Sequence, residues 1–347
     1  MKRFLLFASQ LYSYSILRPI QKAIRDRGDD VSWFLYNMDS KYIKDDESVI
    51  TDIDSVMRYD PFAVITCNNW VPYFFPGIKV EVFHGFNAQK RDSHIGHFRM
   101  RGWFDLYCTQ GPSTTENFQE LAKKLGYFHV AETGWSKLDP LFTPHAVPDY
   151  RERYNITKPI ILYTSTFTQN LSSAPVVFDT IKQLAKTNDW YWFINLHPKM
   201  DKSIVKQYQS LESDNVKFFE TDDVLPLLKA ADVMLSDTSS IVFEFLTLDK
   251  PVVTFRHRQP GPYLLNITDT QQIESSLNEA LARPQNLMNS INAYANELHP
   301  YRDGKSSERV LHSIDYFSEN VQGKLKRKPL NLGRKFMVRK RFHHFGI

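Results

Sequence analysis

The sequence predicts an α/β protein of two halves, each built on a parallel β-sheet with helices packed against it. The chain has 347 residues, which is more than a single hydrophobic core usually supports. Short apolar runs rich in β-branched and aromatic residues alternate with segments of helical spacing, as in doubly wound sheets. Four prolines between residues 140 and 159 interrupt this alternation, which then begins again. Two such halves imply a ligand cleft between them, at the carboxyl ends of the strands.

The first half alternates short strands with helices that end at glycines. Gly28 and Gly126 follow the last apolar residue of a helical pattern, which is a common position for a helix stop. We expect strands at residues 4–8, 31–36, 63–67, 80–83 and 106–109, and helices at 16–27 and 113–124.

The second half repeats the alternation and closes with three helical stretches. We expect strands at residues 159–164, 190–196, 216–219, 233–235 and 252–255, and helices at 174–186, 224–230, 241–248, 271–283, 285–298 and 304–319. The expected division is a first domain of residues 1–145, a second domain of residues 146–321 and a tail of residues 322–347.

The composition is typical of a soluble globular protein, with 42% hydrophobic and 24% charged residues. No apolar run approaches the ~20 residues that cross a bilayer. Lys2 and Arg3 precede an apolar stretch of only residues 4–8, shorter than the ~7–15 residues of a signal-peptide core. We interpret it as a buried strand and expect a cytoplasmic chain. Cys67 and Cys108 lie in strand-like runs, where we expect buried thiols; two cysteines cannot form a disulfide framework or a zinc site.

Positive charge is concentrated in the tail. Residues 322–347 carry nine Lys and Arg and no Asp or Glu, so the rest of the chain is acidic although the net charge is +4. Basic residues interleaved with Phe336, Phe342 and Phe345 fit attachment to an anionic membrane. A solvated tail and an arm that binds RNA or another polyanion are alternatives. The acidic body argues against a protein whose whole face binds nucleic acid.

Two strands of the predicted sheets run into a histidine. In VEVFHGFNAQK (80–90) His84 ends a strand, and we expect Gly85 to allow a sharp turn or a close approach to a ligand. In WYWFINLHPKM (190–200) His197 follows an apolar strand, and Pro198 biases its backbone towards an extended conformation. A histidine at such a position can exchange a proton near neutral pH, and a structural strand-end histidine is the alternative.

A third constellation joins a buried strand to a helix between residues 232 and 255. Five small polar residues (236–240) precede the predicted helix 241–248. Free backbone N–H groups at a helix start bind anions such as a pyrophosphate, and plain capping is the alternative. Glu244 lies in the first turn of this helix, where it could bind a ribose hydroxyl. The aromatic segment 70–76 (WVPYFFP) is interpreted as core, or alternatively as an exposed loop that touches an acceptor lipid or a membrane.

A dehydrogenase is disfavoured, because the turn after the first strand, SQLYSYS, lacks the GxGxxG pattern. Two Rossmann-like domains with this cleft are the GT-B architecture of nucleotide-sugar transferases.

Seven motifs in order resemble the CDP-glycerol glycerophosphotransferase family, which primes and polymerises wall teichoic acids and related chains. The resemblance covers about residues 80–310. Ser136 stands where the family usually has proline, and Thr164–Ser165 where it has Ala-Pro, which indicates a divergent member. The motifs are HGFNAQK (84–90), TGWSKLD (133–139), ILYTSTF (161–167), LHP (196–198), SDTSSIVFEFL (236–246), KPVVTF (250–255) and DGKSSERV (303–310).

The resemblance implies roles for individual residues. His84 is similar to the family's base for the acceptor hydroxyl, and His197 to its histidine at the donor pyrophosphate. Lys137 stands where the family has a basic residue that neutralises the phosphates. The phosphate-binding helix start is carried by Thr238, Ser239 and Ser240.

The resemblance also implies an activity and partners. It implies transfer of glycerol phosphate, or a related polyol phosphate, from CDP-glycerol to a hydroxyl of a lipid-linked acceptor, with release of CMP. The polymer would be of the teichoic-acid or capsule type. The first domain would serve the acceptor and the second the nucleotide donor. The tail would hold the protein peripherally at the inner face of the cell membrane. We expect no cofactor, no metal and no nucleic-acid partner; Asp237 is the one metal candidate, more simply a turn residue.

Two alternatives remain at this point. One is a GT-B nucleotide-sugar glycosyltransferase or a relative of the UDP-sugar 2-epimerases. The other is a membrane-tethered module that binds a nucleotide without turnover.

Overall fold

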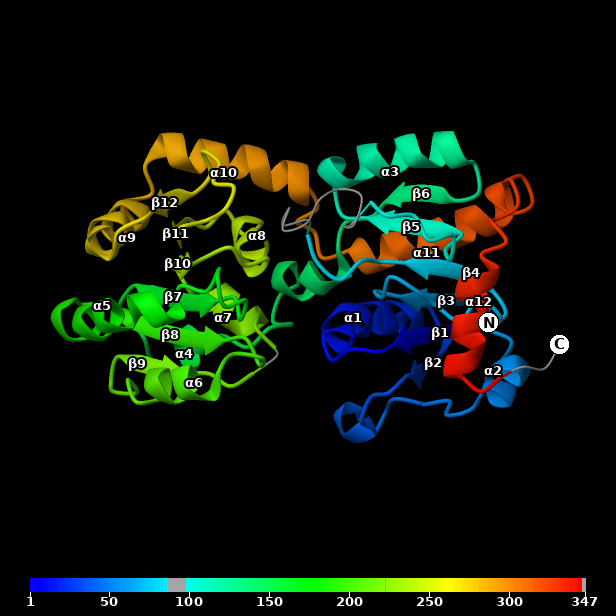
Figure 1. Ribbon diagram of the computed structural model, residues 1–347, viewed down its shortest axis with the longest axis horizontal. Coiled ribbons are helices and arrows are strands. Elements are labelled where there is room, and N and C mark those ends of the chain that lie inside the picture. Colours follow the sequence, from blue (N-terminus) through cyan, green and yellow to red (C-terminus); the bar gives the residue numbers. More distant parts are fainter. Residues whose placement is uncertain (87–97, 222, 345–347) are drawn as a thin grey trace. The chain divides into compact units, whose positions relative to one another are not determined.

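Two units, each built on its own six-stranded sheet, make up the described part of the chain (Figure 1). The predicted α/β class with two parallel sheets is confirmed. The computed structural model describes residues 1–86, 98–221 and 223–344. Among them, unit 1 comprises residues 1–85, 98–139 and 301–344, and unit 2 comprises residues 86, 140–221 and 223–300.

The sheet of unit 1 has the strand order β2-β1-β3-β4-β5-β6, and every neighbouring pair is parallel. Its central strands are buried on both faces, which explains why they read as continuous apolar runs. The strands are β1 (Arg3–Ala8), β2 (Asp30–Leu35), β3 (Ala63–Thr66), β4 (Ile78–Glu81), β5 (Leu106–Thr109) and β6 (His129–Glu132).

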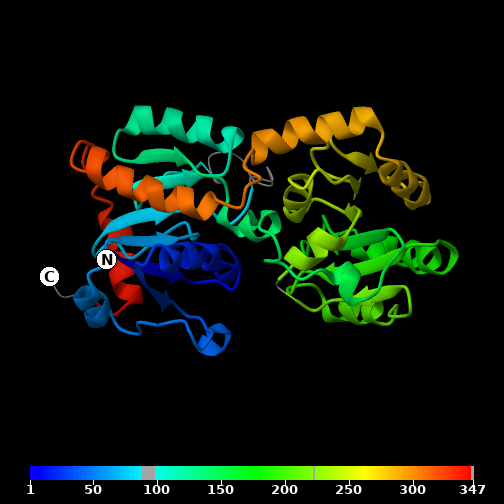
Figure 2. The ribbon, with the colours of Figure 1, turned by 180° about the vertical axis from the view of Figure 1, so that it is seen from behind.

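Helices cover both faces of this sheet. Helices α1 and α11 pack on each other over one face, whereas α3 and α12 contribute to the core on the other, as the opposed views of Figures 1 and 2 show. The helices of unit 1 are α1 (Ser13–Asp26), α2 (Ile53–Tyr59), α3 (Pro112–Leu125), α11 (Ser306–Tyr316) and α12 (Leu332–Arg341), with short turns η1 (Ser40–Tyr42), η2 (Ser136–Phe142) and η4 (Phe317–Val321).

The sheet of unit 2 has the order β12-β11-β10-β7-β8-β9 and is also parallel throughout. Helices α5, α6 and α9 form a core with one face. Helices α7 and α8 contact strands of the sheet, and they contact α4 and α10, respectively. The strands are β7 (Ile160–Ser165), β8 (Tyr191–Leu196), β9 (Val216–Phe218), β10 (Val233–Ser236), β11 (Val252–Phe255) and β12 (Leu265–Ile267). The helices are α4 (Tyr150–Arg153), α5 (Ala174–Thr187), α6 (Lys202–Gln209), α7 (Leu225–Ala230), α8 (Ile241–Leu246), α9 (Ile273–Ala282) and α10 (Gln285–Leu298), with the turn η3 (Thr270–Gln272).

Each sheet has one point at which the strand order reverses direction. In unit 1 this switch point lies between β1 and β3, and in unit 2 between β7 and β10. Open parallel sheets bind ligands outside the carboxyl ends of the strands at the switch point. These two edges are therefore where functional side chains are to be sought.

The boundaries of the units differ from the expected division at residues 145 and 321. The chain passes from unit 1 to unit 2 after Asp139, and residues from Tyr301 onward return to unit 1. Asp139 explains the return, because its carboxylate accepts hydrogen bonds from the backbone N–H groups of Ser306 and Ser307 at 2.9 and 2.7 Å. This cap ties the start of α11 to unit 1.

The tail also belongs to unit 1 and folds as a helix against it. Val338 is buried in the core, and the ring of Phe342 lies 4.9 Å from that of Tyr36 and 5.7 Å from that of Phe74. Lys328 forms an ion pair of 2.6 Å with Asp105. The alternative of a fully solvated tail is therefore wrong.

The aromatic segment 70–76 is the surface on which the end of the tail packs. Val71 and Phe75 are buried, so the core interpretation is confirmed for these two residues. Trp70 and Phe74 are half-buried and contact Phe342 instead of facing solvent freely. Pairing of aromatic rings from two distant segments is what keeps the tail on the unit.

Candidate active-site residues at the carboxyl edge of each sheet

His84 lies at the carboxyl edge of unit 1, three residues after the end of β4, and is exposed. Its Nδ1 atom is 3.2 Å from the backbone oxygen of Cys67, which follows β3. A carbonyl oxygen only accepts hydrogen bonds, so Nδ1 carries the proton. The neutral imidazole then has its lone pair on Nε2, and it is able to take up a proton there.

The backbone before His84 is strained. Phe83 has a φ of 55° although it is a bulky, buried residue, and left-handed backbone is costly for such a side chain. The chain bends at His84 and Gly85, although Gly85 does not have a left-handed φ, and a Cβ built on it would meet no atom within 4 Å. The ring of Tyr12, which follows β1, stacks on His84 with centroids 5.5 Å apart. His84 therefore reaches towards the switch point between β1 and β3.

His197 lies at the carboxyl edge of unit 2, directly after β8, and is also exposed. Here Nδ1 is the acceptor, because the backbone N–H of Lys199 donates to it at 3.0 Å. A neutral ring with an accepting Nδ1 carries its proton on Nε2. The ring of Phe167, from the loop after β7, lies 4.3 Å from His197. His197 thus presents an N–H donor beside the switch point of unit 2.

The predicted phosphate loop follows β10 at that switch point. Thr238 is buried, and its hydroxyl oxygen accepts the backbone N–H of Arg258 at 3.0 Å. Ser239 and Ser240 are half-buried and precede α8. Helix α8 has six residues, fewer than the predicted eight, and Glu244 in it is buried.

Asp237 connects the ends of the two switch-point strands of unit 2. It is fully buried, and its carboxylate accepts hydrogen bonds from the backbone N–H groups of Thr166 and Ser173 at 3.0 and 2.8 Å. The hydroxyls of Ser165 and Ser173 donate to it at 2.6 and 3.0 Å. Burial raises the pKa of Asp237, although these hydrogen bonds oppose the shift. The sequence suggested a turn residue here, whereas the structure assigns a link that shapes the loop carrying Phe167.

Both departures from the family motifs have a structural counterpart. Ser165 stands where the family usually has proline, and its hydroxyl donates one of the hydrogen bonds that the carboxylate of Asp237 accepts. Ser136 is buried and donates to the backbone oxygen of Ile16 in α1 at 2.7 Å. Proline could make neither hydrogen bond, since it has no hydroxyl.

The remaining predicted residues are placed as follows. Lys137 lies in unit 1, in η2, with its Nζ 5.2 Å from the ring centroid of Trp135. Its assignment to the donor phosphates therefore stays a prediction. Residues 87–90 of the first motif lie outside the described residues. Among the residues that the structure describes, no group of three or more His, Cys, Asp or Glu is arranged to hold a metal ion.

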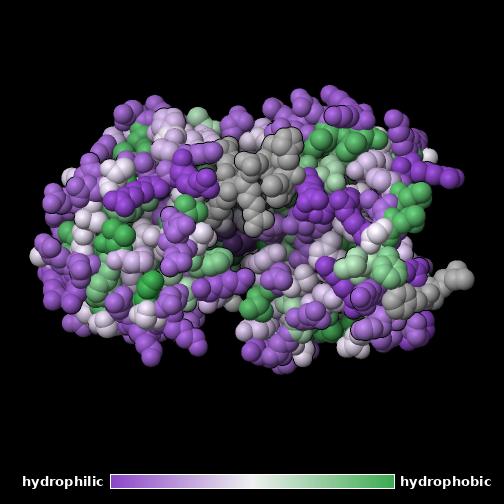
Figure 3. All heavy atoms as spheres, in the orientation of Figure 1, coloured by the Kyte–Doolittle hydropathy of each residue, from purple (hydrophilic) through white to green (hydrophobic). Residues whose placement is uncertain are grey.

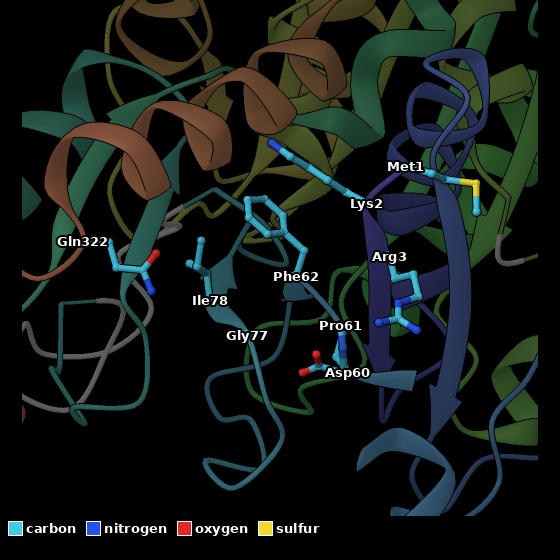
Figure 4. Close-up of a pocket in the computed structure, with 9 residues that line it drawn as sticks. All are labelled: Met1, Lys2, Arg3, Asp60, Pro61, Phe62, Gly77, Ile78 and Gln322. Atoms are coloured by element: carbon cyan, nitrogen blue, oxygen red, sulfur yellow. The ribbon is translucent and has the colours of Figure 1, made fainter. Parts of the chain in front are cut away.

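A pocket of about 410 Å³ lies at the opposite, amino edge of the unit 1 sheet (Figure 4). Arg3, Phe62 and Ile78 line it near the first residues of β1, β3 and β4. Ligands of parallel sheets bind at the carboxyl edge, so we do not assign this pocket to the donor or the acceptor. In the described ranges no helix is long and apolar enough to cross a membrane.

Comparison with known proteins identifies the family. The family model of CDP-glycerol:poly(glycerophosphate) glycerophosphotransferase matches residues 99–316. The teichoic acid glycerol-phosphate primase of Bacillus subtilis (strain 168) is 30% identical over 66% of this chain and 62% of its own length. The teichoic acid poly(ribitol-phosphate) polymerase of Bacillus spizizenii (strain W23) is 30% identical over 85% of this chain and 52% of its own length. The chain thus spans between half and two thirds of these relatives.

Solved structures share the fold. The wall teichoic acid polymerase TagF superimposes with a TM-score of 0.67 at 15% identity, over 92% of this chain and 90% of that one. A complex of S. aureus MnaA with UDP gives a TM-score of 0.67 at 17% identity, over 95% and 99% of the two chains. With a family model that matches more than half of its residues, the chain belongs to the CDP-glycerol:poly(glycerophosphate) glycerophosphotransferase family.

Proposed function

We propose that this chain transfers glycerol phosphate, or a related polyol phosphate, from CDP-glycerol or a similar CDP-polyol to an acceptor hydroxyl. The observation that carries the proposal is the different partner of Nδ1 in the two edge histidines, a carbonyl oxygen for His84 and a backbone N–H for His197. In the neutral rings, these partners place the proton of His84 on Nδ1 and that of His197 on Nε2. A phosphoryl transfer needs one group that accepts a proton from the nucleophile and others that stabilise charge on the phosphates.

His84 is the base of the proposed reaction. Its Nε2 lone pair takes the proton of the acceptor hydroxyl as that oxygen attacks the phosphorus bonded to the polyol. The new oxygen–phosphorus bond forms while the bond from that phosphorus to the bridging oxygen of the diphosphate breaks. CMP leaves with the bonding electron pair, so atoms and charge balance. The strained backbone at Phe83 supports this role by holding His84 in one orientation.

His197 is the donor of a hydrogen bond to the diphosphate. Its Nε2–H stabilises the negative charge that develops on the leaving CMP. Ser239 and Ser240 supply further hydrogen bonds to the same phosphates, and Lys137 adds positive charge. Glu244 binds a ribose hydroxyl in this proposal, which requires a local opening because its side chain is buried.

The acceptor is lipid-linked in this proposal, and the tail brings the enzyme to an anionic membrane at its cytoplasmic face. Leu332, Phe336 and Met337 on α12 are 71%, 58% and 52% exposed, among basic residues. Figure 3 shows hydrophobic side chains over α12 beside hydrophilic ones. Because Val338 and Phe342 hold the helix on unit 1, the tail would meet the membrane as a folded basic and apolar surface.

Release of CMP tests the activity. The full chain is incubated with CDP-glycerol and a lipid-linked acceptor, and in parallel with CDP-ribitol and with UDP-N-acetylglucosamine. We expect CMP release that depends on the acceptor and the CDP-polyol. No CMP from any CDP-polyol, with turnover of the UDP-sugar, would overturn the proposal.

That last outcome would favour a second candidate, a UDP-sugar 2-epimerase. The fold likeness to S. aureus MnaA has the same TM-score as that to TagF. A probable UDP-N-acetylglucosamine 2-epimerase of Ralstonia nicotianae is 26% identical over 36% of this chain and 35% of its own length. The epimerase reaction would convert the UDP-sugar without any CDP-polyol.

Vesicle binding tests the membrane surface. The double variant Phe336→Ser, Met337→Ser should sediment about tenfold less with phosphatidylglycerol vesicles than wild type, since it loses apolar area that would insert. Tyr316→Ser, which changes a 49% exposed side chain of α11, is the matched control and should bind as wild type. Equal sedimentation of all three chains would contradict the role of α12.

A further inference from the structure

The connection after β11 carries two arginines whose side chains have different surroundings. Arg256, at φ 52°, donates from Nε to the backbone oxygen of Thr268 at 3.1 Å, and its guanidinium lies 4.8 Å from the ring centroid of Phe255. Arg258 is exposed, and in the described part of the chain its guanidinium makes no hydrogen bond, ion pair or ring contact. Arg256 thus stabilises the turn, whereas the guanidinium of Arg258 is available to bind a ligand.

The backbone of Arg258 is held at the switch point of unit 2. Its N–H donates to the hydroxyl oxygen of Thr238, which brings the end of β11 against the loop that follows β10. Strands β7 and β8 come next in the sheet, and His197 follows β8. Two strand spacings, roughly 10 Å, therefore separate the β10 loop from the strand end that carries His197.

The charges along this stretch of the edge favour an anion. The loop after β10 contains the carboxylate of Asp237, which is fully buried and accepts hydrogen bonds from four donors. His197 and Lys199 are exposed on the β8 side, and Arg258 is exposed on the β11 side. A doubly charged ligand above β7 and β10 would meet positive groups from both sides.

We propose that Arg258 binds the diphosphate of the nucleotide donor, opposite His197. The inference rests on the proposed function, because it names a further ligand of the same donor. A guanidinium matches phosphate well, since its planar fork forms two parallel charge-assisted hydrogen bonds. Its backbone anchor on Thr238 limits the entropy lost on binding, because the turn is already ordered.

Calorimetric titration of the full chain with CDP and with cytidine tests this role. Arg258→Ala should weaken CDP binding about 10- to 100-fold, the range for a lost hydrogen-bonded charge pair. Cytidine binding should stay unchanged, because it has no phosphate. Arg258→Lys should fall between wild type and Arg258→Ala, since an ammonium keeps the charge and loses the fork.

Arg256→Ala is the matched control, with the same change of charge two residues away, and should bind CDP within about threefold of wild type. Equal CDP affinity of Arg258→Ala and wild type would overturn the inference and leave the proposed function intact. An equal loss in Arg256→Ala and Arg258→Ala would also overturn it, because the effect would then come from general charge or from the turn that Arg256 stabilises, and not from the guanidinium of Arg258. A wild-type chain that binds neither CDP nor CDP-glycerol would overturn the proposed function itself.

Discussion

The two sheets resemble each other at their amino edges and differ at their carboxyl edges. At the amino edges, Lys79 of unit 1 donates to the backbone oxygens of Gly77 and Pro76, and Lys250 of unit 2 donates to those of Leu228, Lys229 and Ala231. Burial lowers the pKa of both lysines to about 8. At the carboxyl edges each unit carries one histidine after a strand, β4 in unit 1 and β8 in unit 2, but Nδ1 donates in one and accepts in the other. The same scaffold thus supports two different proton positions, because a backbone carbonyl faces His84 and a backbone amide faces His197.

The largest expected effect comes from replacing each histidine by glutamine. His84→Gln should lower kcat/KM for CMP release by at least ~10², because an amide cannot accept the proton. His197→Gln should lose only about tenfold, since the glutamine amide still offers an N–H to the phosphates. The measurement is CMP release from CDP-glycerol with a saturating acceptor. Thermal unfolding of both variants close to that of wild type is the control. Equal losses, or a larger loss at 197, would contradict the assigned roles.

The second comparison uses two buried aspartates, one in each unit. Asp237→Asn and Asp139→Asn should each lower the free energy of unfolding by about 1–3 kcal/mol, because an amide nitrogen would face donors that now meet an oxygen. CDP affinity should fall in Asp237→Asn alone, since only Asp237 shapes the loop that carries Phe167. Urea unfolding and calorimetry measure the two quantities. Unchanged CDP affinity in Asp237→Asn would reduce this residue to a purely structural one.

Substitutions at the start of α8 should have a smaller effect. Ser240→Asp should weaken CDP binding about tenfold, because its carboxylate would repel the phosphates. Ser239→Ala should weaken it only about twofold, since several donors share the ligand. Titration with CDP distinguishes the two variants. CDP binding by Ser240→Asp as tight as that by wild type would contradict the binding of the phosphates at this loop.

The smallest expected effect tests the likeness of the amino edges. The pKa of each lysine is lower in the folded chain than in the unfolded chain, so between pH about 8 and ~10.4 the unfolded state holds more protons. Stability from these groups therefore rises with pH in that window, by at most about 1.4 kcal/mol per pH unit for each lysine. Lys79→Met and Lys250→Met should each lose this rise, measured as the free energy of unfolding at pH 8 and 9. A rise that persists unchanged in either variant would contradict the burial argument for that lysine.

The sequence alone determined the fold class and the residues at the strand ends. Continuous apolar runs such as those of β1 and β7 identify strands that are buried on both faces, whatever their partners. His84 and His197 were found because each follows such a run. Strands β6 (HVAE) and β12 (LNI) were missed, because both are short and only partly apolar. Helix α6 was missed as well, since one of its residues alone is buried.

Tertiary structure decided what sequence patterns do not encode. The second domain was expected to run to residue 321, whereas the chain returns to unit 1 at Tyr301, because Asp139 caps α11 from 167 residues away. The sequence of the tail is typical of a basic arm, yet in the structure Phe342 packs on the aromatic segment 70–76 and holds the tail there. Arg256 and Arg258 look equivalent in the sequence, and only their contacts distinguish them.

Tertiary structure also decided the proton positions of the two histidines. Their positions follow from local sequence, because a strand and the residues after it are encoded by neighbours in the chain. Their proton positions depend on which backbone atom lies within hydrogen-bonding distance of Nδ1. For His197 that atom is the amide of Lys199, two residues away, whereas for His84 it is the carbonyl of Cys67, which lies 17 residues away and is brought close by the pairing of β3 with β4.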